Sequence, residues 1–499
     1  MARKTSRNPS GAPRQSKRPD ASSVAKAGKG EEEVTLARSL GFWGSFSIGY
    51  ADVGADIYIA LGVVVTWAMG AAPLAFLLAS ILYACTGLSY AELAAAHPVA
   101  GGGAVYARKA FGNAASFIAG WGLLLDYTID ISLFAVASIG YLGYLVPILH
   151  ASLLIPITIM GYTIPISISI TGLVAAVLVS FLIILNYIGI RESASLNTIF
   201  VIIDMIGLSI IMAIGFTMAW SWGMVVGQIQ WGTEPPIGSF FYAISIAIVS
   251  FIGLESISQA AEETHEPSRI IPKTTLALIA AVILFSVGVT LLAVGVVPWQ
   301  LLATSHLDPM AAFAGALPFG FIIAPIIAVI GATICYVSAN TGIVGVSRVT
   351  YEMGRSGLFP QWFNRLHPKH RVPYRSIITF SLIGIGLAFL GNLELLVDLY
   401  NFGALVNYMA VNLALIRLRN SPKEEKHPWR VRGALRIPWR DGRRLEVPVT
   451  AVIGFVSCFL VWVAIVLLHF WGRLGGTLWF LIGFALYALY RKRHGLPLR

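Results

Sequence analysis

The sequence predicts an all-α polytopic membrane protein. Hydrophobic residues make up 57% of the 499 residues and charged residues only 12%, whereas soluble domains carry about 25% charged residues. Apolar runs of about 20 residues, the length at which a helix crosses the hydrocarbon core, recur along most of the chain. These two observations exclude a soluble globular protein.

Twelve apolar segments are expected to span the membrane, and the third and eighth are long enough to be tilted or to carry an extra turn. They cover 41–66, 72–97, 114–147, 164–189, 195–222, 237–261, 274–298, 319–352, 375–391, 395–418, 447–470 and 475–491. The residues before them are rich in Arg, Lys, Ser, Pro and Gly and lack an apolar stretch, so they predict a disordered tail and not a signal peptide. The expected organisation is a basic cytoplasmic tail (1–39), a ten-helix core (40–419), a basic cytoplasmic loop (420–446), two further helices (447–491) and a cytoplasmic C-terminus (492–499).

The basic residues predict the orientation of these segments. If the N-terminus lies inside, every Lys and Arg except Arg473 falls in an inside segment. The positive-inside rule then predicts a multi-pass protein of the plasma (inner) membrane with both termini in the cytoplasm. The net charge of +11 is therefore a topology signal, and the expected partner is the lipid bilayer, with no nucleic acid.

The first apolar segment contains a stretch that favours a helix break. Gly54 lies between Asp52 and Asp56. Glycine weakens a helix by about 1 kcal/mol relative to alanine, and a carboxylate at membrane depth costs at least about 2.5 kcal/mol. The sixth segment has a similar interruption at Gly253 and Glu255. Two interrupted helices in corresponding positions are typical of an inverted-repeat transporter with a site at the midplane, although close helix packing also uses glycine.

Six acids are expected at membrane depth, and no Lys or Arg lies in their segments. They are Asp52, Asp56, Asp126, Asp130, Asp204 and Glu255. Intramembrane acids usually serve ions, protons or substrate, and burial favours the neutral form of a carboxyl group, so one or two of them could load and release a proton. For any single acid, a structural hydrogen bond to a neighbouring helix is the alternative.

No enzymatic chemistry is expected, and neither a cofactor nor a metal site. The histidines stand singly at segment ends or in loops, without a nucleophile or metal-ligand spacing around them. Cys85, Cys335 and Cys458 lie inside apolar segments and are interpreted as small buried hydrophobic residues. Phe251 precedes the break in the sixth segment, where both a gate over a substrate and plain packing remain open.

Several ordered motifs over roughly residues 41–420 resemble a known family. The chain reads Tyr90-Ala91-Glu92-Leu93, then His97-Pro98-Val99-Ala100-Gly101-Gly102-Gly103, later Gly253-Leu254-Glu255-Ser256 with Glu262-Glu263, and finally Gly354-Arg355-Ser356-Gly357-Leu358-Phe359-Pro360. These motifs are similar to those of the amino acid–polyamine–organocation (APC) superfamily of permeases, and most similar to its cationic amino acid transporter branch.

This resemblance implies a LeuT-like fold, a 5+5 inverted repeat with helices 1 and 6 broken and two extra helices. It also implies secondary transport of an amino acid or related organic cation by alternating access, often coupled to protons. Carried onto this chain, the expected substrate-binding residues are Gly54, Ala55, Asp56, Tyr58, Phe251, Ile252, Gly253 and Glu255. The expected ion- or proton-coupling residues are Asp126, Asp130, Asp204, Glu255 and Tyr400.

Two departures from the family pattern leave other functions open. Asp56 stands where relatives keep a small residue, and Asp204 stands where proton-coupled members often carry a lysine. Both add negative charge, which disfavours an anionic group and favours a cation. Leu125-Asp126-Tyr127 and Leu399-Tyr400 also resemble the potassium-uptake branch. The alternatives are therefore a potassium–proton symporter, whose bound partner is a monovalent cation, and a sensor that binds its small-molecule substrate without transport.

Overall fold

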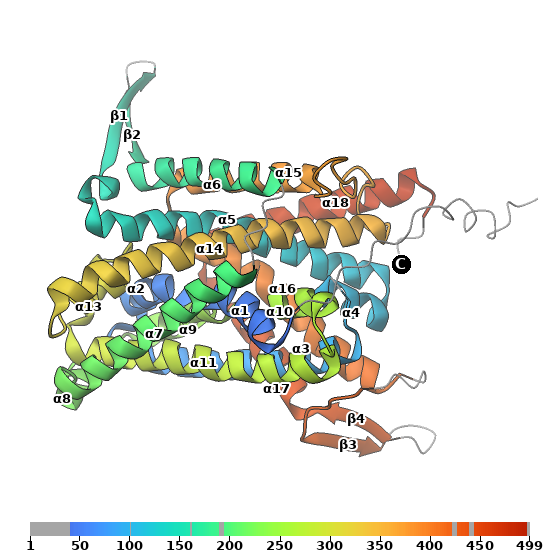
Figure 1. The fold of residues 1–499 in the computed structure, drawn as a ribbon, viewed down its shortest axis with the longest axis horizontal. Helices are drawn as coiled ribbons and strands as arrows, with labels where there is room; N and C mark the ends of the chain where they lie inside the picture. Colours follow the sequence, from blue (N-terminus) through green and yellow to red (C-terminus); the bar gives the residue numbers. More distant parts are fainter. Residues whose placement is uncertain are drawn as a thin grey trace, which may run out of the picture. The chain divides into compact units, whose positions relative to one another are not determined.

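The structure is a computed structural model in which most of the chain is helical (Figure 1). It describes residues 40–99, 101–159, 162–188, 194–421, 427–438 and 444–496. The predicted disordered tail, residues 1–39, lies outside the described residues. Within the part described, long helices run side by side in one bundle.

The helices follow the predicted apolar segments closely. Those of the first half are α1 (Phe42–Val53), α2 (Asp56–Ala68), α3 (Ala72–Ala96), α4 (Gly102–Phe111), α5 (Asn113–Leu145), α6 (Ile170–Ile188), α7 (Ala194–Met218) and α8 (Trp222–Gly227). Those of the second half are α9 (Ile237–Ala247), α10 (Leu254–Gln259), α11 (Pro267–Val296), α12 (Trp299–Thr304), α13 (Pro309–Gly315), α14 (Gly320–Arg355), α15 (Tyr374–Leu390), α16 (Leu393–Arg419), α17 (Val449–Leu468) and α18 (Thr477–Arg493).

Prolines and glycines set many of these boundaries. Pro267 and Pro309 are the first residues of α11 and α13, a position where the missing N–H costs nothing. Gly391, with φ +60°, ends α15 in the left-handed conformation that glycine adopts without a steric penalty.

Two very long helices form the centre of the bundle. Helix α5 has 33 residues and α14 has 36 residues. At about 1.5 Å per residue both exceed the roughly 30 Å hydrocarbon core, as expected for the third and eighth segments. They pack along each other, and α16 packs against α5 from another side (Figure 1).

Ten helical segments of the described residues are long and apolar enough to cross a membrane. One of them, Phe42–Ala96, contains α1, α2 and α3, while α15 is a shorter apolar helix of 17 residues. The class of fold, an all-helical membrane protein, therefore agrees with the sequence. The number of twelve spans stays a prediction.

The start of the fourth segment differs from the prediction. Strands β1 (Ser152–Ile159) and β2 (Tyr162–Ser169) form an antiparallel hairpin, and α6 begins only at Ile170. The helix predicted from residue 164 is therefore wrong for its first six positions. Isoleucine alternates there with Thr, Ser and Pro, and Pro156 lies opposite Pro165. β-Branched residues favour strands, and proline disfavours a helix interior.

A second hairpin lies in what the sequence suggested was an irregular basic loop. Strand β3 (Ala434–Pro438) pairs antiparallel with β4 (Arg444–Pro448). The next residue, Val449, is the first of α17. The loop therefore contains an ordered element that is continuous with a membrane helix.

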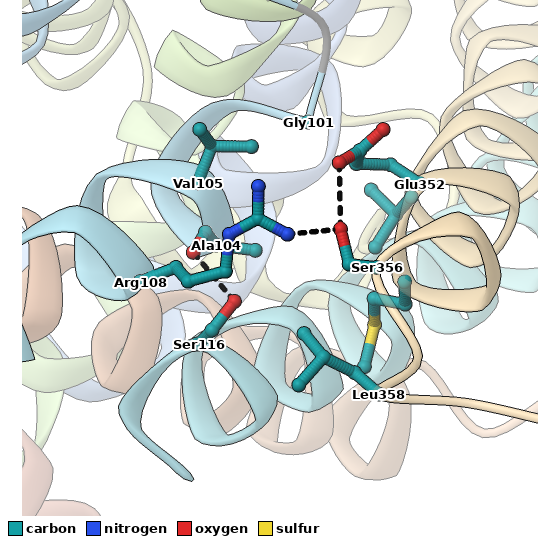
Figure 2. A pocket seen from close by; sticks show the side chains of 10 residues that line it. Gly101, Ala104, Val105, Arg108, Ser116, Glu352, Ser356 and Leu358 are labelled. Atoms are coloured by element: carbon teal, nitrogen blue, oxygen red, sulfur yellow. Dashed lines mark hydrogen bonds between the residues drawn. The ribbon is translucent and has the colours of Figure 1, made fainter. Parts of the chain in front are cut away.

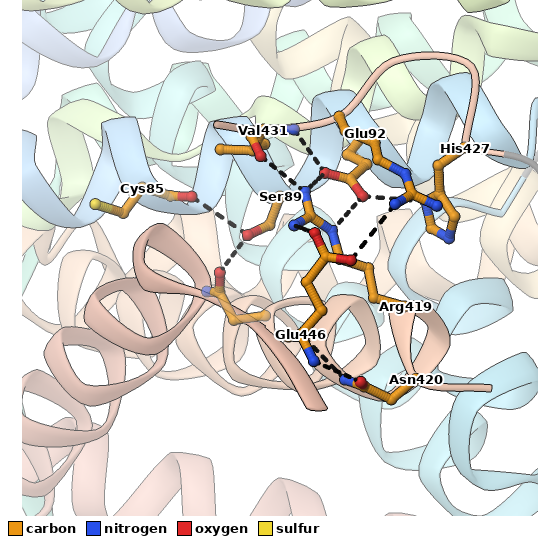
Figure 3. Close-up of polar contacts among 10 residues, drawn as sticks. Cys85, Ser89, Glu92, Arg419, Asn420, His427, Val431 and Glu446 are labelled. Atoms are coloured by element: carbon orange, nitrogen blue, oxygen red, sulfur yellow. Dashed lines mark hydrogen bonds and ion pairs between the residues drawn. The ribbon is translucent and has the colours of Figure 1, made fainter. Parts of the chain in front are cut away.

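A buried ionic network attaches this hairpin to the bundle (Figure 3). Arg419, the last residue of α16, donates from Nε to Glu92 Oε1 of α3 at 2.6 Å, and its Nη2 also reaches Glu92 Oε2. Glu92 Oε2 accepts the Val431 N–H at 2.8 Å, and Glu92 Oε1 lies 3.0 Å from His427 Nδ1. The side chains of Arg419 and Glu92 are 1% and 0% exposed. The network fixes the segment after α16 against α3.

Removing one member of this pair should destabilise the protein. We expect Arg419→Met to lower the free energy of unfolding by about 3–5 kcal/mol, because it leaves Glu92 as an uncompensated buried charge. The double variant Glu92→Met/Arg419→Met should recover most of the loss. Thermal unfolding midpoints of the purified protein in detergent measure both effects, and a single variant as stable as the parent would contradict the expectation.

Candidate functional site

The first helix break is short. Helix α1 ends at Val53 and α2 begins at Asp56, with Gly54 (φ −66°) and Ala55 (φ −72°) between them still in the right-handed helical region. The Gly54 N–H donates to the Tyr50 carbonyl at 2.6 Å. A Cβ atom at Gly54 would lie 2.4 Å from Tyr50 Cε1 and 2.7 Å from the Tyr50 carbonyl oxygen. The chain therefore changes direction here with little unwinding, and the tyrosine ring needs a glycine beside it.

The second break is wider. After α9, residues Ile248–Phe251 form one 3₁₀ turn, Ile252 is extended (φ −96°, ψ 149°), and α10 begins at Leu254. Gly253 has φ +117°, a conformation that favours glycine. A Cβ atom there would lie 2.5 Å from Val53 Cγ2 and 3.1 Å from Asp52 Cβ. The two breaks are therefore in contact through the backbone of Gly253.

Asp56 lies where these breaks meet. It is the first residue of α2, where the free N–H groups of the first turn favour a negative charge. Its side chain is fully buried, and neither carboxyl oxygen has a hydrogen-bond partner among the described residues. The Ile252 N–H, which belongs to the extended segment of the second break, interacts with this carboxyl group without reaching the geometry of a full hydrogen bond. A buried carboxylate with so little compensation requires a proton or a cation.

Asp126 of α5 and Glu255 of α10 form a carboxyl pair. Their carboxyl groups interact with each other electrostatically, and two buried carboxyl groups side by side favour a state in which one of them carries a proton. Neither Asp126 oxygen accepts a hydrogen bond from a donor group in the part of the chain that is described. Glu255 Oε2 accepts the Tyr408 hydroxyl at 3.1 Å. The Tyr408 oxygen accepts the Gly253 N–H at 3.2 Å, so this tyrosine links the carboxyl pair to the second break.

Asp52 and Asp130 complete what we call the acidic cluster: Asp52, Asp56, Asp126, Asp130 and Glu255. The Ser256 hydroxyl donates to Asp52 Oδ2, and the Ser338 hydroxyl lies 3.4 Å from the Asp52 carbonyl oxygen and 3.5 Å from Asp130 Oδ1. The five carboxyl groups interact electrostatically with one another, and each is at most 1% exposed. Over the described residues, no lysine, arginine or histidine pairs with any of them.

Asp204 of α7 lies in a different environment. Its Oδ2 accepts the Tyr50 hydroxyl at 2.9 Å and its Oδ1 accepts the Tyr58 hydroxyl at 2.5 Å. Tyr50 belongs to α1 and Tyr58 to α2, so one carboxyl group holds both sides of the first break. Asp204 thus has two strong donors, which Asp56 and Asp126 lack.

The predicted aromatic residues lie around the cluster. The Phe251 ring is fully buried and packs on Tyr83 and Phe76 of α3, with centroids 5.2 and 6.4 Å away. Tyr400 of α16 is close enough to Asp56 and Asp130 to interact with them electrostatically. Every predicted site residue therefore lies at one of the two breaks or next to the acidic cluster, and Asp204 is joined to the first break through Tyr50 and Tyr58. Whether Phe251 gates a substrate stays a prediction.

Sequence reasoning missed the residues that hold the breaks in place. Tyr50, Tyr83, Ser338 and Tyr408 were not predicted. Tyr408 follows Tyr400 by eight residues, a spacing that keeps both on one broad face of α16. This spacing is the sequence signal from which Tyr408 could have been predicted. Ser338 begins the stretch Ser338-Ala339-Asn340-Thr341-Gly342, which also resembles the potassium-uptake branch, whereas nothing comparable points to Tyr83.

The site is closed at the end of the bundle that carries α4, which we call the basic end because Arg108 and Lys109 end that helix. Figure 2 shows the residues that line a small hollow there, between α4, the start of α5 and the end of α14. Arg108 donates to the Ser356 hydroxyl, which donates to Glu352 Oε1 at 2.8 Å. The hollow is separate from the acidic cluster, whose members are all buried, so a solute reaches them only after the helices move.

Comparison with known proteins agrees with this architecture. A family model described as amino acid permease matches residues 40–488. The branched-chain amino acid permease BcaP of Bacillus subtilis is 28% identical over 93% of this chain and 95% of its own length. The methylthioribose transporter of the same organism is also 28% identical, over the same shares. The vacuolar cationic amino acid transporter 4 of Arabidopsis thaliana is 28% identical over 78% of this chain and 64% of its own length.

These matches confirm the predicted resemblance to the APC superfamily, a transporter in place of an enzyme, and the LeuT-type all-α fold class that the family has. Because the family model covers nearly the whole described chain, including both helix breaks, the protein belongs to the amino acid permease family.

Proposed function

We propose that this permease moves an amine-bearing organic solute, an amino acid or a related organic cation such as a polyamine, by alternating access with proton coupling. It does so at the plasma membrane, with both termini in the cytoplasm. The observation that carries the proposal is the acidic cluster at the contact of the two helix breaks, where Asp56 and Asp126 accept no hydrogen bond from a donor group among the described residues.

The charge of the cluster favours a cationic substrate group. Carboxyl groups at membrane depth are retained when a proton, an ion or a substrate compensates them. An ammonium group next to Asp56 and Glu255 would supply that compensation. The carbonyl groups around Phe251, Ile252 and Gly253 belong to the irregular second break, and such carbonyl groups suit an ammonium group in the same position.

Asp56 occupies the position where a substrate carboxylate would otherwise bind. In a broken helix, the first turn after the break normally holds the anionic group of the substrate, but here Asp56 itself stands at that turn. A carboxylate-bearing amino acid therefore requires Asp56 to be protonated, whereas a diamine or polyamine can bind its anion. The same residue thus decides between the two substrate classes.

The relatives support transport of small organic solutes in general. Their names mention branched-chain amino acids, methylthioribose and cationic amino acids. These names cover both charged and uncharged solutes at similar identity. The proposal of a cationic substrate for this chain therefore rests on its acidic cluster and not on the names of its relatives.

Proton coupling is proposed for the Asp126–Glu255 pair. A proton shared by two carboxyl groups is released or rebound when a positive charge arrives or leaves nearby. Tyr408 connects Glu255 to Gly253, so a change in charge at the pair acts on the second break. Asp204, with its two tyrosine donors, is better suited to positioning α1 and α2, and Asp130 and Tyr400 contribute to the field of the cluster.

Potassium–proton symport is the second candidate. The acidic cluster offers oxygen atoms only, and carboxylate and carbonyl oxygens replace the hydration shell of an alkali cation well. A sensor that binds its substrate without moving it is the third. One transport assay separates all three.

We expect counterflow in proteoliposomes to move labelled arginine or putrescine, with a neutral amino acid as the comparison solute and rubidium as the potassium analogue. Arginine or putrescine should accumulate because the cluster favours a positively charged amine. Movement of rubidium alone would overturn the leading proposal in favour of potassium transport. Saturable binding without counterflow of any solute would favour a sensor.

We expect Asp56→Asn to reduce uptake by roughly 10- to 100-fold, the effect of losing a hydrogen bond to a charged group. The variant should remain inserted and monodisperse, because Asp56 donates and accepts no hydrogen bond in the described part of the chain. Glu394→Gln is the matched control, since Glu394 is an exposed acid in the first turn of α16. Uptake by Asp56→Asn equal to that of the control would remove Asp56 from the site.

The pH dependence of uptake should distinguish Asp126 from Asp204. We expect Asp126→Asn, and likewise Glu255→Gln, to flatten the pH profile because each removes a carboxyl group from the pair that shares a proton. Asp204→Asn should lower the rate at every pH while the shape of the profile remains, because it weakens the contact to Tyr50 and Tyr58. Initial uptake rates over a pH series measure both, and an unchanged profile in the first two variants would refute this assignment of the proton.

A further inference from the structure

The β3–β4 hairpin presents an unusual surface for a loop of a transporter. Leu435 and Ile437 of β3 are 58% and 44% exposed. Every residue of β3 after Ala434 is exposed, whereas β4 is half-buried and packs on α16 and α17. Strand β3 is therefore the outer strand, and it carries two large apolar side chains that the described protein does not cover.

The pairing of the strands separates apolar and polar faces. Leu435 lies opposite Val447 and Ile437 lies opposite Leu445, while Arg436 lies opposite Glu446. Side chains of alternate residues point to opposite faces of a sheet. One face of the hairpin is thus formed by four aliphatic residues, and the other carries the charged residues.

The polar face is held by the protein. The Glu446 carboxylate lies 3.6 Å from Arg419 Nη1 and 3.4 Å from Arg430 Nη1. The Glu446 backbone exchanges hydrogen bonds with the Asn420 side chain at 2.8 and 2.9 Å. Figure 3 shows Arg419, Asn420 and Glu446 together with Glu92. These contacts fix which way the aliphatic face points.

The hairpin is also continuous with the lipid-facing surface. Its last residue, Pro448, is followed directly by α17, which exposes Val452, Val456 and Leu460 by 37%, 46% and 61%. In Figure 1 the two strands lie at the side of the bundle near α17, towards the basic end where α4 lies. A membrane helix that begins at the end of a strand keeps that strand close to the bilayer surface.

Among the described residues of the hairpin and of the segment just before it, three exposed basic side chains lack an ion pair: Arg432, Arg436 and Arg444. The acid of the described strands, Glu446, is already engaged. Basic side chains next to a membrane segment are attracted to anionic lipid headgroups, and the long arginine side chain can reach a headgroup while its stem lies on apolar surface.

We propose that the β3–β4 hairpin docks on the bilayer surface at the basic end. Leu435 and Ile437 enter the interface between headgroups and acyl chains. Arg432, which precedes the strands, and Arg436 and Arg444, which lie on the opposite face of the hairpin, extend past its edge to anionic phosphate headgroups. The occupant of this surface is lipid. The proposal is independent of the transported solute and requires only that α17 is a membrane helix.

The full-length protein tests this in lipid nanodiscs. Leu435→Cys is labelled with an environment-sensitive fluorophore, and the three native cysteines are buried. Thr233→Cys, on an exposed turn, is the matched control for a label in water. Quenching by iodide reports access to water, and quenching by spin-labelled lipid reports contact with the bilayer.

In discs of phosphatidylcholine with phosphatidylglycerol, we expect iodide quenching at position 435 to be at least about threefold weaker than at position 233, because interfacial burial excludes the anion. Spin-labelled lipid should quench position 435 more strongly than position 233. The triple variant Arg432→Gln/Arg436→Gln/Arg444→Gln, or salt at about 1 M, which shortens the Debye length to about 3 Å, should reduce this lipid contact.

Equal iodide quenching at both positions would overturn the proposal. Protection of position 435 that appears only with two protein molecules per disc would also overturn it, because a second copy would then be the occupant. Lipid contact that is identical in phosphatidylcholine alone would remove the arginines from the proposal and contradict their assignment as headgroup ligands.

Discussion

The contact between Gly253 and the end of α1 is the constraint on which the rest of the site depends. Any side chain at position 253 would meet Val53 and Asp52, and the φ of +117° independently favours glycine. The close approach brings the irregular backbone of the second break to the first turn of α2. It places the Ile252 segment close enough to Asp56, and Glu255 close enough to Asp126, for these groups to interact electrostatically. The acidic cluster draws on four helices (α1, α2, α5 and α10) and is gathered around this contact between the Gly253 backbone and the Val53 and Asp52 side chains.

The hydrogen bonds divide these acids by role. Asp204 receives two tyrosine hydroxyls, so its charge is compensated by fixed donors and it binds α1 to α2. Asp52 receives Ser256. Asp56 and Asp126 receive none in the described part of the chain, although they are as deeply buried. Since the cost of burying a carboxylate must be met by a proton, a cation or a donor, the function we propose assigns the substrate cation and the proton to the acids without fixed donors.

The sequence predicted the breaks and the acids because glycine and aspartate are rare and costly within a membrane helix. It could not predict how far each break unwinds: Gly54 stays helical and Gly253 does not, which depends on the neighbouring backbone. Tyr408 and Ser338 act through partners that are distant in sequence. The two hairpins were missed for a local reason. Runs of Ile, Thr and Pro at 152–169 have the hydrophobicity of a membrane segment, and the arginines around β3 suggested an irregular loop.

In the function we propose, the substrate class depends on Asp56, and the geometry limits the ways in which its charge can be compensated. It cannot share the first turn of α2 with a substrate carboxylate while both are charged, because two carboxylates there would repel each other in a site of low dielectric. A protonated Asp56 would need an acceptor for its O–H group, and a neighbouring group would have to bind the proton when Asp56 releases it. The carboxyl groups of Asp52 and Asp130 are close enough to interact with Asp56. An ammonium group would need no such proton transfer. It compensates the charge of Asp56 directly, and it only donates hydrogen bonds, which suits a site lined by carboxyl and carbonyl oxygens. The simpler electrostatic solution is therefore an amine beside Asp56, with the substrate's remaining polar groups directed at the carbonyls of the second break.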